Sequence, residues 1–146
     1  MKREYFAVFA VILLLMTSAC GKSSIYNTEG VDIDLSKVSS VVAYAEVYNI
    51  YQEYESYFGK VIRLKGTFDV YYDEEKDVNY FSCVVTDEMA CCSLSMEFVL
   101  AGDYSYPEDY PQNGSSVTVT GVFGVYEEEG LLYCQLTDAY LGEKGA

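Results

Sequence analysis

Cysteines are the residues of this 146-residue chain best suited to chemistry. Cys20 follows an apolar segment and stands apart from the other four, which are Cys83, Cys91, Cys92 and Cys134. Thiolates bind zinc and Cu(I), and an even number of thiols in an exported domain favours disulfides. The four cysteines therefore leave three alternatives open: disulfide or redox pairing, a metal site, or inert buried thiols.

Spacing does not decide among these alternatives. Cys91 and Cys92 are adjacent, and a bridge between neighbours forces strained disulfide geometry, so each would pair more easily with Cys83 or Cys134. The spacing C-x7-CC is unlike the C-x-x-C turns of zinc ribbons. Two acidic residues lie close enough in sequence to add oxygen ligands for zinc or copper: Asp87 and Glu97. The acidic surroundings supply no cation to activate a thiolate, so an oxidoreductase is disfavoured.

Composition excludes several function classes. The chain has no histidine, which rules out Ser-His-Asp and Cys-His catalysis and any histidine-ligated metal. Its formal net charge is −14, so the surface repels phosphate backbones and nucleic acid is not an expected partner. The acidic stretches 73–77 and 127–129 lack the calcium-loop pattern and are typical of solvated hairpin tips. Paired carboxylates such as Asp87 and Glu97 have no basic partner, so we expect a binding module and not an enzyme.

Tyrosine is abundant, with 16 in the chain. Six tyrosines cluster around a predicted hairpin and a long loop: Tyr71, Tyr72, Tyr80, Tyr104, Tyr106 and Tyr110. OB-like barrels bind ligands with the second and third strands and the neighbouring loops, so these rings form a candidate stacking surface for a sugar, a peptide or another small ligand. The alternative is that the rings only cover the sheet.

The N-terminus has the order of an export signal. Lys2 and Arg3 precede an uncharged apolar run over 6–16, and small residues then lead to Cys20. The run is too short for a membrane-spanning helix. We therefore predict a signal peptide over 1–19 and a flexible tether over 20–30.

The cleavage region resembles a lipobox, in which Cys20 receives a diacylglyceryl group before the signal is removed. Thr17 stands where lipoboxes usually have leucine, which leaves ordinary secretory cleavage after Ala19 as the alternative. The resemblance implies a lipid-anchored protein on the extracytoplasmic face of a bacterial cell membrane.

The rest of the chain, 31–146, is the size of one domain. Hydrophobic positions at spacings of three and four predict a helix over about 42–57, and Gly59 supplies its stop. Beyond it the period becomes two, and strands are predicted over about 60–72, 79–86, 94–100, 116–126 and 131–137. In the first strand, Arg63, Lys65, Thr67 and Asp69 are expected opposite the apolar face. The start, 31–43, fits either a strand or a helix. We predict a mainly β fold: a small five-stranded OB-like barrel preceded by one α-helix.

Four segments together resemble a group of uncharacterised lipoproteins from Gram-positive anaerobes: DLSKVSSVVAYAEVYNI, YFGKVIRLKGTF, ACCSLSMEFVL and YPQNGSSVTVTGVFGVYEEEGLLYCQLTDAYL. The Y-x-G-K-x-I-x-x-K-G pattern and the paired cysteines are also similar to the small extracytoplasmic domain of permease-associated membrane proteins. These resemblances imply an OB-like domain and an extracytoplasmic location. We expect a lipid-tethered module that binds a small ligand or a partner protein beside the membrane, in concert with a transporter. The resemblances imply no catalytic residue.

Overall fold

Strands dominate the fold, as the alternating pattern predicts. The computed structural model describes residues 26–28 and 30–142. Its strands are β1 (Tyr26–Thr28), β2 (Val31–Asp34), β3 (Val61–Asp73), β4 (Val78–Thr86), β5 (Ser93–Leu100), β6 (Ser116–Glu128) and β7 (Leu131–Leu141). One α-helix, α2 (Ser40–Gln52), and a short 3-10 helix, η2 (Tyr54–Tyr57), connect β2 to β3. The expectation of a mainly β fold with one α-helix is confirmed.

The predicted signal over 1–19 and Cys20 lie outside the described residues. Within the predicted tether, Tyr26–Thr28 forms β1, which pairs antiparallel with β2. In the part of the chain that the structure describes, no helix is long and apolar enough to cross a membrane.

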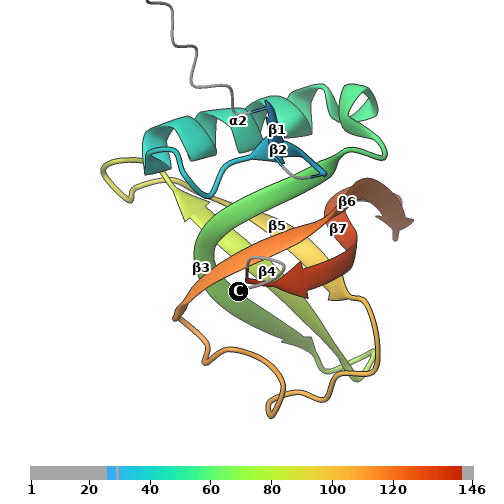
Figure 1. Ribbon diagram of the computed structural model, residues 1–146. Helices are drawn as coiled ribbons and strands as arrows, with labels where there is room; N and C mark the ends of the chain where they lie inside the picture. Colours follow the sequence, from blue (N-terminus) through green and yellow to red (C-terminus); the bar gives the residue numbers. More distant parts are fainter. Residues whose placement is uncertain (1–25, 29, 143–146) are drawn as a thin grey trace, which may run out of the picture.

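The strands pair in the order β1-β2-β3-β4-β5-β7-β6, and β6 also pairs with β3. This last pairing closes a ring of five strands, β3 to β7 (Figure 1). The pairs β2–β3 and β5–β7 are parallel, and the others are antiparallel. If the five ring strands are numbered along the chain from β3 as the first, neighbours around the ring follow the order first, second, third, fifth, fourth.

Strand β3 divides its pairing between two neighbours. Its first half pairs with β6 as far as Thr67, and its second half pairs with β4 from Thr67 onward. Gly66 sits at this transition, where an added Cβ would lie 2.8 Å from the Sγ of Cys83 and would also collide with the backbone of Val84. Glycine is therefore required for the close approach that lets β3 coil around the ring.

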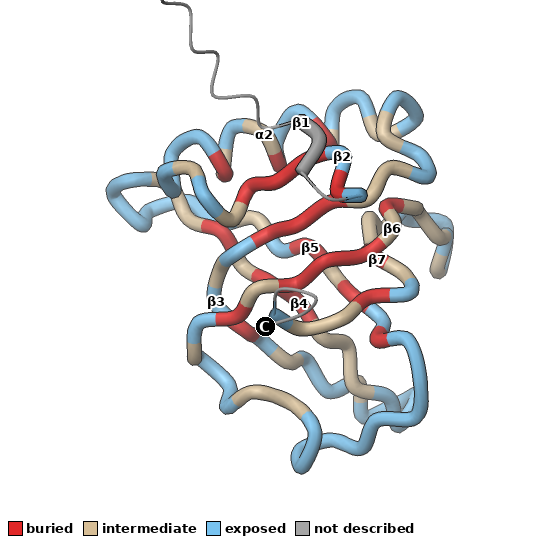
Figure 2. The backbone as a smooth tube through the Cα atoms, in the orientation of Figure 1, coloured by how far each residue is buried: buried red, intermediate tan, exposed pale blue. Residues whose placement is uncertain are grey.

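The interior of the ring is a closed core. Aromatic and aliphatic side chains from all five strands fill it, including Phe68, Phe98, Phe123, Met96 and Leu136. Helix α2 lies across one end, and the loop over 101–115 runs past the opposite end (Figure 1). Figure 2 shows the buried residues as separate stretches that gather in the middle of the strands and beneath α2.

Helix α2 supplies its own share of this core. Ser39 caps its N-terminus by accepting a hydrogen bond from the amide of Val42, and the helix buries Ala43, Val47 and Ile50. The predicted single helix over 42–57 is wrong in its last turn. The α-helix ends at Gln52, and the chain tightens into η2, where 3-10 geometry closes the end of the helix.

Arg63 belongs to the face of β3 that the alternation sets opposite Ile62 and Leu64, yet it is only 6 % exposed. Its side chain reaches Asp34 of β2 and Thr120 of β6. The reason is that β2 packs beside β3 and brings a buried carboxylate, which the alternation within β3 alone does not reveal.

Candidate functional site

A large cleft lies on the outer wall of the ring, between two hairpin turns. It has a volume of about 760 Å³. The β3–β4 turn and the β6–β7 turn form its two sides, and β4 and β5 cross its floor. The lining residues are Asp69, Tyr71, Tyr72, Asp73, Glu74, Glu75, Lys76, Tyr80, Ser82, Ser95, Glu97, Tyr126, Glu128, Glu129 and Tyr133.

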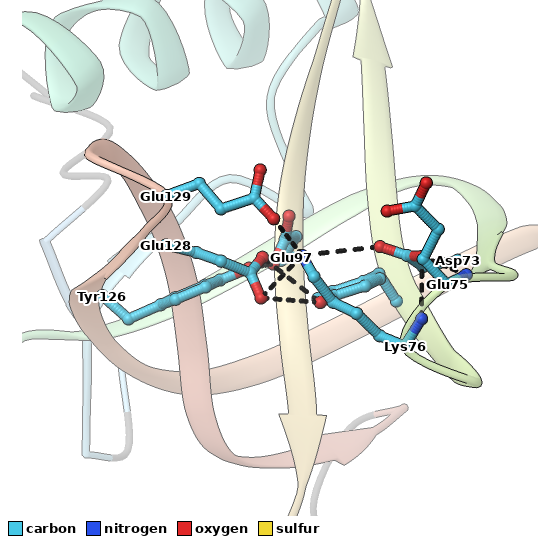
Figure 3. A network of polar contacts seen from close by, with 8 residues as sticks. Asp73, Glu75, Lys76, Glu97, Tyr126, Glu128 and Glu129 are labelled. Carbon is cyan, nitrogen blue, oxygen red and sulfur yellow. Dashed lines mark hydrogen bonds and ion pairs between the residues drawn. The ribbon is translucent and has the colours of Figure 1, made fainter.

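Carboxylates surround a single ammonium group in this cleft. The Nζ of Lys76 lies 3.1 Å from Glu128, 3.2 Å from Glu129 and 3.5 Å from Asp73. The two glutamates reach it from one turn, and Lys76 and Asp73 belong to the other (Figure 3). Hydrogen bonds to Glu128 and Glu129 raise the pKa of Lys76, so this ammonium stays charged. Seven carboxylates against one cation give the cleft a strongly negative field.

Glu97 of β5 lies between the two turns. It accepts a hydrogen bond of 2.6 Å from the hydroxyl of Tyr126. Burial raises the pKa of Glu97, the nearby Glu128 carboxylate raises it further, and the bond from Tyr126 opposes this. The hydroxyl of Tyr80 donates to Glu128 at 3.0 Å. These contacts fix acidic and phenolic oxygens in place before any ligand arrives.

Aromatic rings complete the wall of the cleft. Tyr126 and Tyr133 stack with ring centroids 5.3 Å apart, and Tyr71 packs on Tyr80 at 6.3 Å. Tyr71 is 65 % exposed. Flat rings beside acidic groups suit ligands that have an apolar face together with cationic or hydroxyl groups.

The six tyrosines predicted as one stacking surface divide into two groups. Tyr71, Tyr72 and Tyr80 line the cleft. Tyr106 and Tyr110 instead pack on Phe81, the latter with ring centroids 4.0 Å apart, while Tyr104 is exposed outside the cleft. Tyr110 and Tyr80 also line a smaller second cleft, so the loop over 101–115 meets the first hairpin beside the core, outside the larger cleft.

The cysteines do not form one site either. All four described cysteines are free thiols. Cys83 is opposite Met96, four residues along β5 from Cys92, so the two are about 13 Å apart along the strands. Strand β5 also separates Cys83 from Cys134, a spacing of roughly 10 Å. Both separations exceed the reach of a disulfide.

Burial keeps two of these thiols protonated. It raises the pKa of Cys83 to about 12. It also raises the pKa of Cys134 to about 11, with a further contribution from Glu97.

Glu97, predicted as a possible additional metal ligand, is five residues from Cys92 along one strand, or about 16 Å. It therefore does not join the adjacent cysteines.

Asp87, Cys91 and Cys92 do come together, in the loop between β4 and β5. The Oδ1 of Asp87 accepts hydrogen bonds from both cysteine amides, and its Oδ2 lies 3.1 Å from the Sγ of Cys91. The two sulfurs are 3.9 Å apart. Hydrogen bonding to Asp87 raises the pKa of Cys91 to about 11, as the neighbouring Cys92 does to a smaller extent. A resting thiolate nucleophile is therefore not favoured here.

Sequence reasoning missed Tyr126, Tyr133 and Lys76 as cleft residues. The signal that could have found them is topological: β4 and β7 both pair with β5, so the β3–β4 and β6–β7 hairpins lie on either side of that strand. The acidic runs in both turns mark the two sides of the cleft, although each run alone resembles an ordinary hairpin tip.

Comparison of the chain with protein families, with curated proteins and with solved structures gives no match.

Proposed function

We propose that this protein is a lipid-anchored, extracytoplasmic binding module whose outer cleft takes a positively charged ligand. The observation behind the proposal is the cleft itself, in which seven carboxylates and five tyrosine rings surround one ammonium group. The module makes no covalent bonds and acts beside a membrane protein in transport.

An OB-like barrel is the fold that agrees best with this function. The ring order first, second, third, fifth, fourth and the return pairing β3–β6 support it. OB folds bind with the face of their second and third strands and with the loops that join strands one and two and strands four and five. In this chain those parts are β4, β5 and the two acidic turns, which are the parts that enclose the cleft.

The sign of the ligand's charge follows from electrostatics. A phosphate or carboxylate ligand would meet seven acidic groups with a single cation that is already paired three times. An ammonium or guanidinium group gains attraction from the same groups and can also lie over the tyrosine faces. The contacts of Lys76 already show how the carboxylates hold such a group.

Isothermal titration of the purified protein with spermine, a neutral chitotetraose and polyglutamate tests the charge. We expect spermine to bind with an affinity that falls as salt is added, and polyglutamate not to bind. Preference for chitotetraose, or equal heats from all three probes, would refute the cationic ligand.

Variants locate the binding. Glu128→Gln combined with Glu129→Gln removes two of the carboxylates around Lys76, and we expect spermine affinity to fall by roughly tenfold or more. Glu108→Gln, an exposed glutamate in the loop over 101–115, is the matched control and should stay within about twofold. If the control weakens binding as much as the cleft variant, spermine is bound by overall charge and the cleft is not the site.

The anchor has its own test. In a bacterial host, mass spectrometry of the mature N-terminus should show Cys20 with a diacylglyceryl group, and Cys20→Ser should abolish that mass and the membrane association. An unmodified Cys20 at the mature N-terminus would contradict the anchor and leave the cleft untouched.

A further inference from the structure

The loop between β4 and β5 places two neighbouring sulfurs on the same side. Adjacent residues of a strand point to opposite faces, so an extended chain would separate the thiols of Cys91 and Cys92. Here the chain turns at Ala90, which has a φ of 52°, and Asp87 holds the amides of both cysteines. The result is an Sγ–Sγ distance of 3.9 Å with both cysteines exposed.

These distances match tetrahedral zinc coordination. Zinc–sulfur bonds of about 2.3 Å at tetrahedral angles place two sulfurs about 3.8 Å apart. The Oδ2 of Asp87 lies 3.1 Å from the nearer sulfur, compared with about 3.6 Å in such a site, so a small rotation of the carboxylate completes the geometry. The three ligand atoms all lie within 4.8 Å of one another.

The charge and the surroundings of the loop also suit a cation. Two thiolates and one carboxylate give three negative charges when a metal displaces the thiol protons. The exposed cysteines leave a fourth coordination position open to water.

We propose that Asp87, Cys91 and Cys92 form a zinc site with three protein ligands and one exchangeable water. Cys83 and Cys134 take no part, because their strands hold them about 10 Å or more from any partner thiol. This site is separate from the cleft and does not depend on the cationic ligand proposed for it.

Cobalt titration of the reduced, purified protein tests the proposal. Sulfur bound to Co²⁺ gives a near-ultraviolet charge-transfer band, which carboxylate-bound cobalt in the acidic cleft does not give. We expect this band to saturate at one equivalent and to disappear when Zn²⁺ is added. Absence of the band in reduced protein would overturn the proposal.

Four variants identify the ligands. Cys91→Ser or Cys92→Ser should each abolish the two-thiolate band, while Cys134→Ser should keep it. Asp87→Asn retains an oxygen that can accept the two amide hydrogen bonds, so the loop stays folded, but we expect zinc affinity to fall roughly tenfold or more. Loss of the band in Cys134→Ser, its persistence in Cys91→Ser, or an unchanged affinity in Asp87→Asn would each refute this ligand set. Circular dichroism verifies that every variant is folded.

Discussion

Arg63 donates a hydrogen bond from Nη1 to the Oδ2 of Asp34 at 3.2 Å, and this ion pair is buried between β2 and β3. The guanidinium also donates from Nε to the hydroxyl of Thr120 at 3.1 Å. A single arginine thereby joins β2, β3 and β6.

Removing the carboxylate should therefore destabilise the fold. Asp34→Ala leaves a buried guanidinium without its counter-charge, and we expect the free energy of unfolding to fall by about 3 kcal/mol. Urea denaturation measures it. Asp103→Asn, an exposed aspartate, is the control and should change stability by less than about 0.5 kcal/mol. A loss equal to that of the control would mean that the pair contributes nothing.

The Asp34 carboxylate should also make the stability of the fold fall at acidic pH. Burial alone would raise the pKa of Asp34, but hydrogen bonds from Ser36 and the charges of Arg63 and Lys37 together hold it below 3.8. A folded pKa below the unfolded value adds stability that is present above about pH 4 and lost as the pH falls through the folded pKa. The melting temperatures of the protein and of Asp34→Asn should therefore become more alike as the pH falls below 4. A difference in melting temperature that stays constant with pH would contradict this.

The ionisation of Glu97 should have the opposite effect on the stability of the fold. Burial holds its folded pKa above 4.5, so ionising it costs stability at neutral pH, and the cost disappears below the unfolded pKa. Glu97→Gln, which can still accept from Tyr126, is expected to stabilise the fold at pH 7 and to give no advantage at pH 4. Chemical denaturation at both pH values measures the difference, with Glu108→Gln as the exposed control. Destabilisation at pH 7 would show that the charge is favourable.

Two glycines should be irreplaceable and a third should not. An added Cβ at Gly66 would meet the Sγ of Cys83 at 2.8 Å, and one at Gly121 would meet the Cβ of Leu136 at 2.9 Å. Each substitution to alanine should cost about 2 kcal/mol or more. Gly124→Ala has no atom within 4 Å of the new Cβ and should be nearly neutral in the same denaturation experiment. Equal effects at the three positions would refute the close approach.

Tyr110 should matter for stability and not for binding. Its ring stacks on Phe81 with centroids 4.0 Å apart and on Phe68 at 6.1 Å. Tyr110→Ala removes much of the cover at that end of the ring and should cost about 3 kcal/mol. Tyr104→Ala, which removes an exposed ring from the same loop, should leave the melting temperature unchanged. Weaker spermine binding in a folded Tyr110→Ala protein would show that the loop over 101–115 takes part in ligand binding.

The elements of this fold could be read largely from local periodicity. The alternation through Ile62, Leu64 and Phe68 places β3, and the same pattern places the four strands after it. What periodicity could not supply is pairing over long sequence distances. Strand β2 was ambiguous because its four residues find a parallel partner only after the helical crossover. The burial of Arg63 could not be predicted either, because β2 brings Asp34 beside it.

The candidate sites also depended partly on local sequence and partly on long-range strand pairing. Residue types identified tyrosines, acidic turns and cysteines as the groups with chemistry, and three of the six named tyrosines line the cleft. Their grouping depends on strand pairing. The pairing of β4 and β7 with β5 brings Lys76 to Glu128 across 52 residues, and the β4–β5 register separates Cys83 from Cys92. Short loops keep local residues together, as with Asp87 and Cys91. Long-range juxtapositions require the topology.

The filled interior of the strand ring determines where a ligand could bind and how it could be released. Phe68, Phe98 and Phe123 occupy the centre and are at most 2 % exposed, and five strands enclose no space beyond that which side chains fill. Cargo cannot be sequestered inside such a domain. A ligand bound at the proposed outer cleft would stay in contact with solvent, so its binding and release would require no gate to open and no strand to separate.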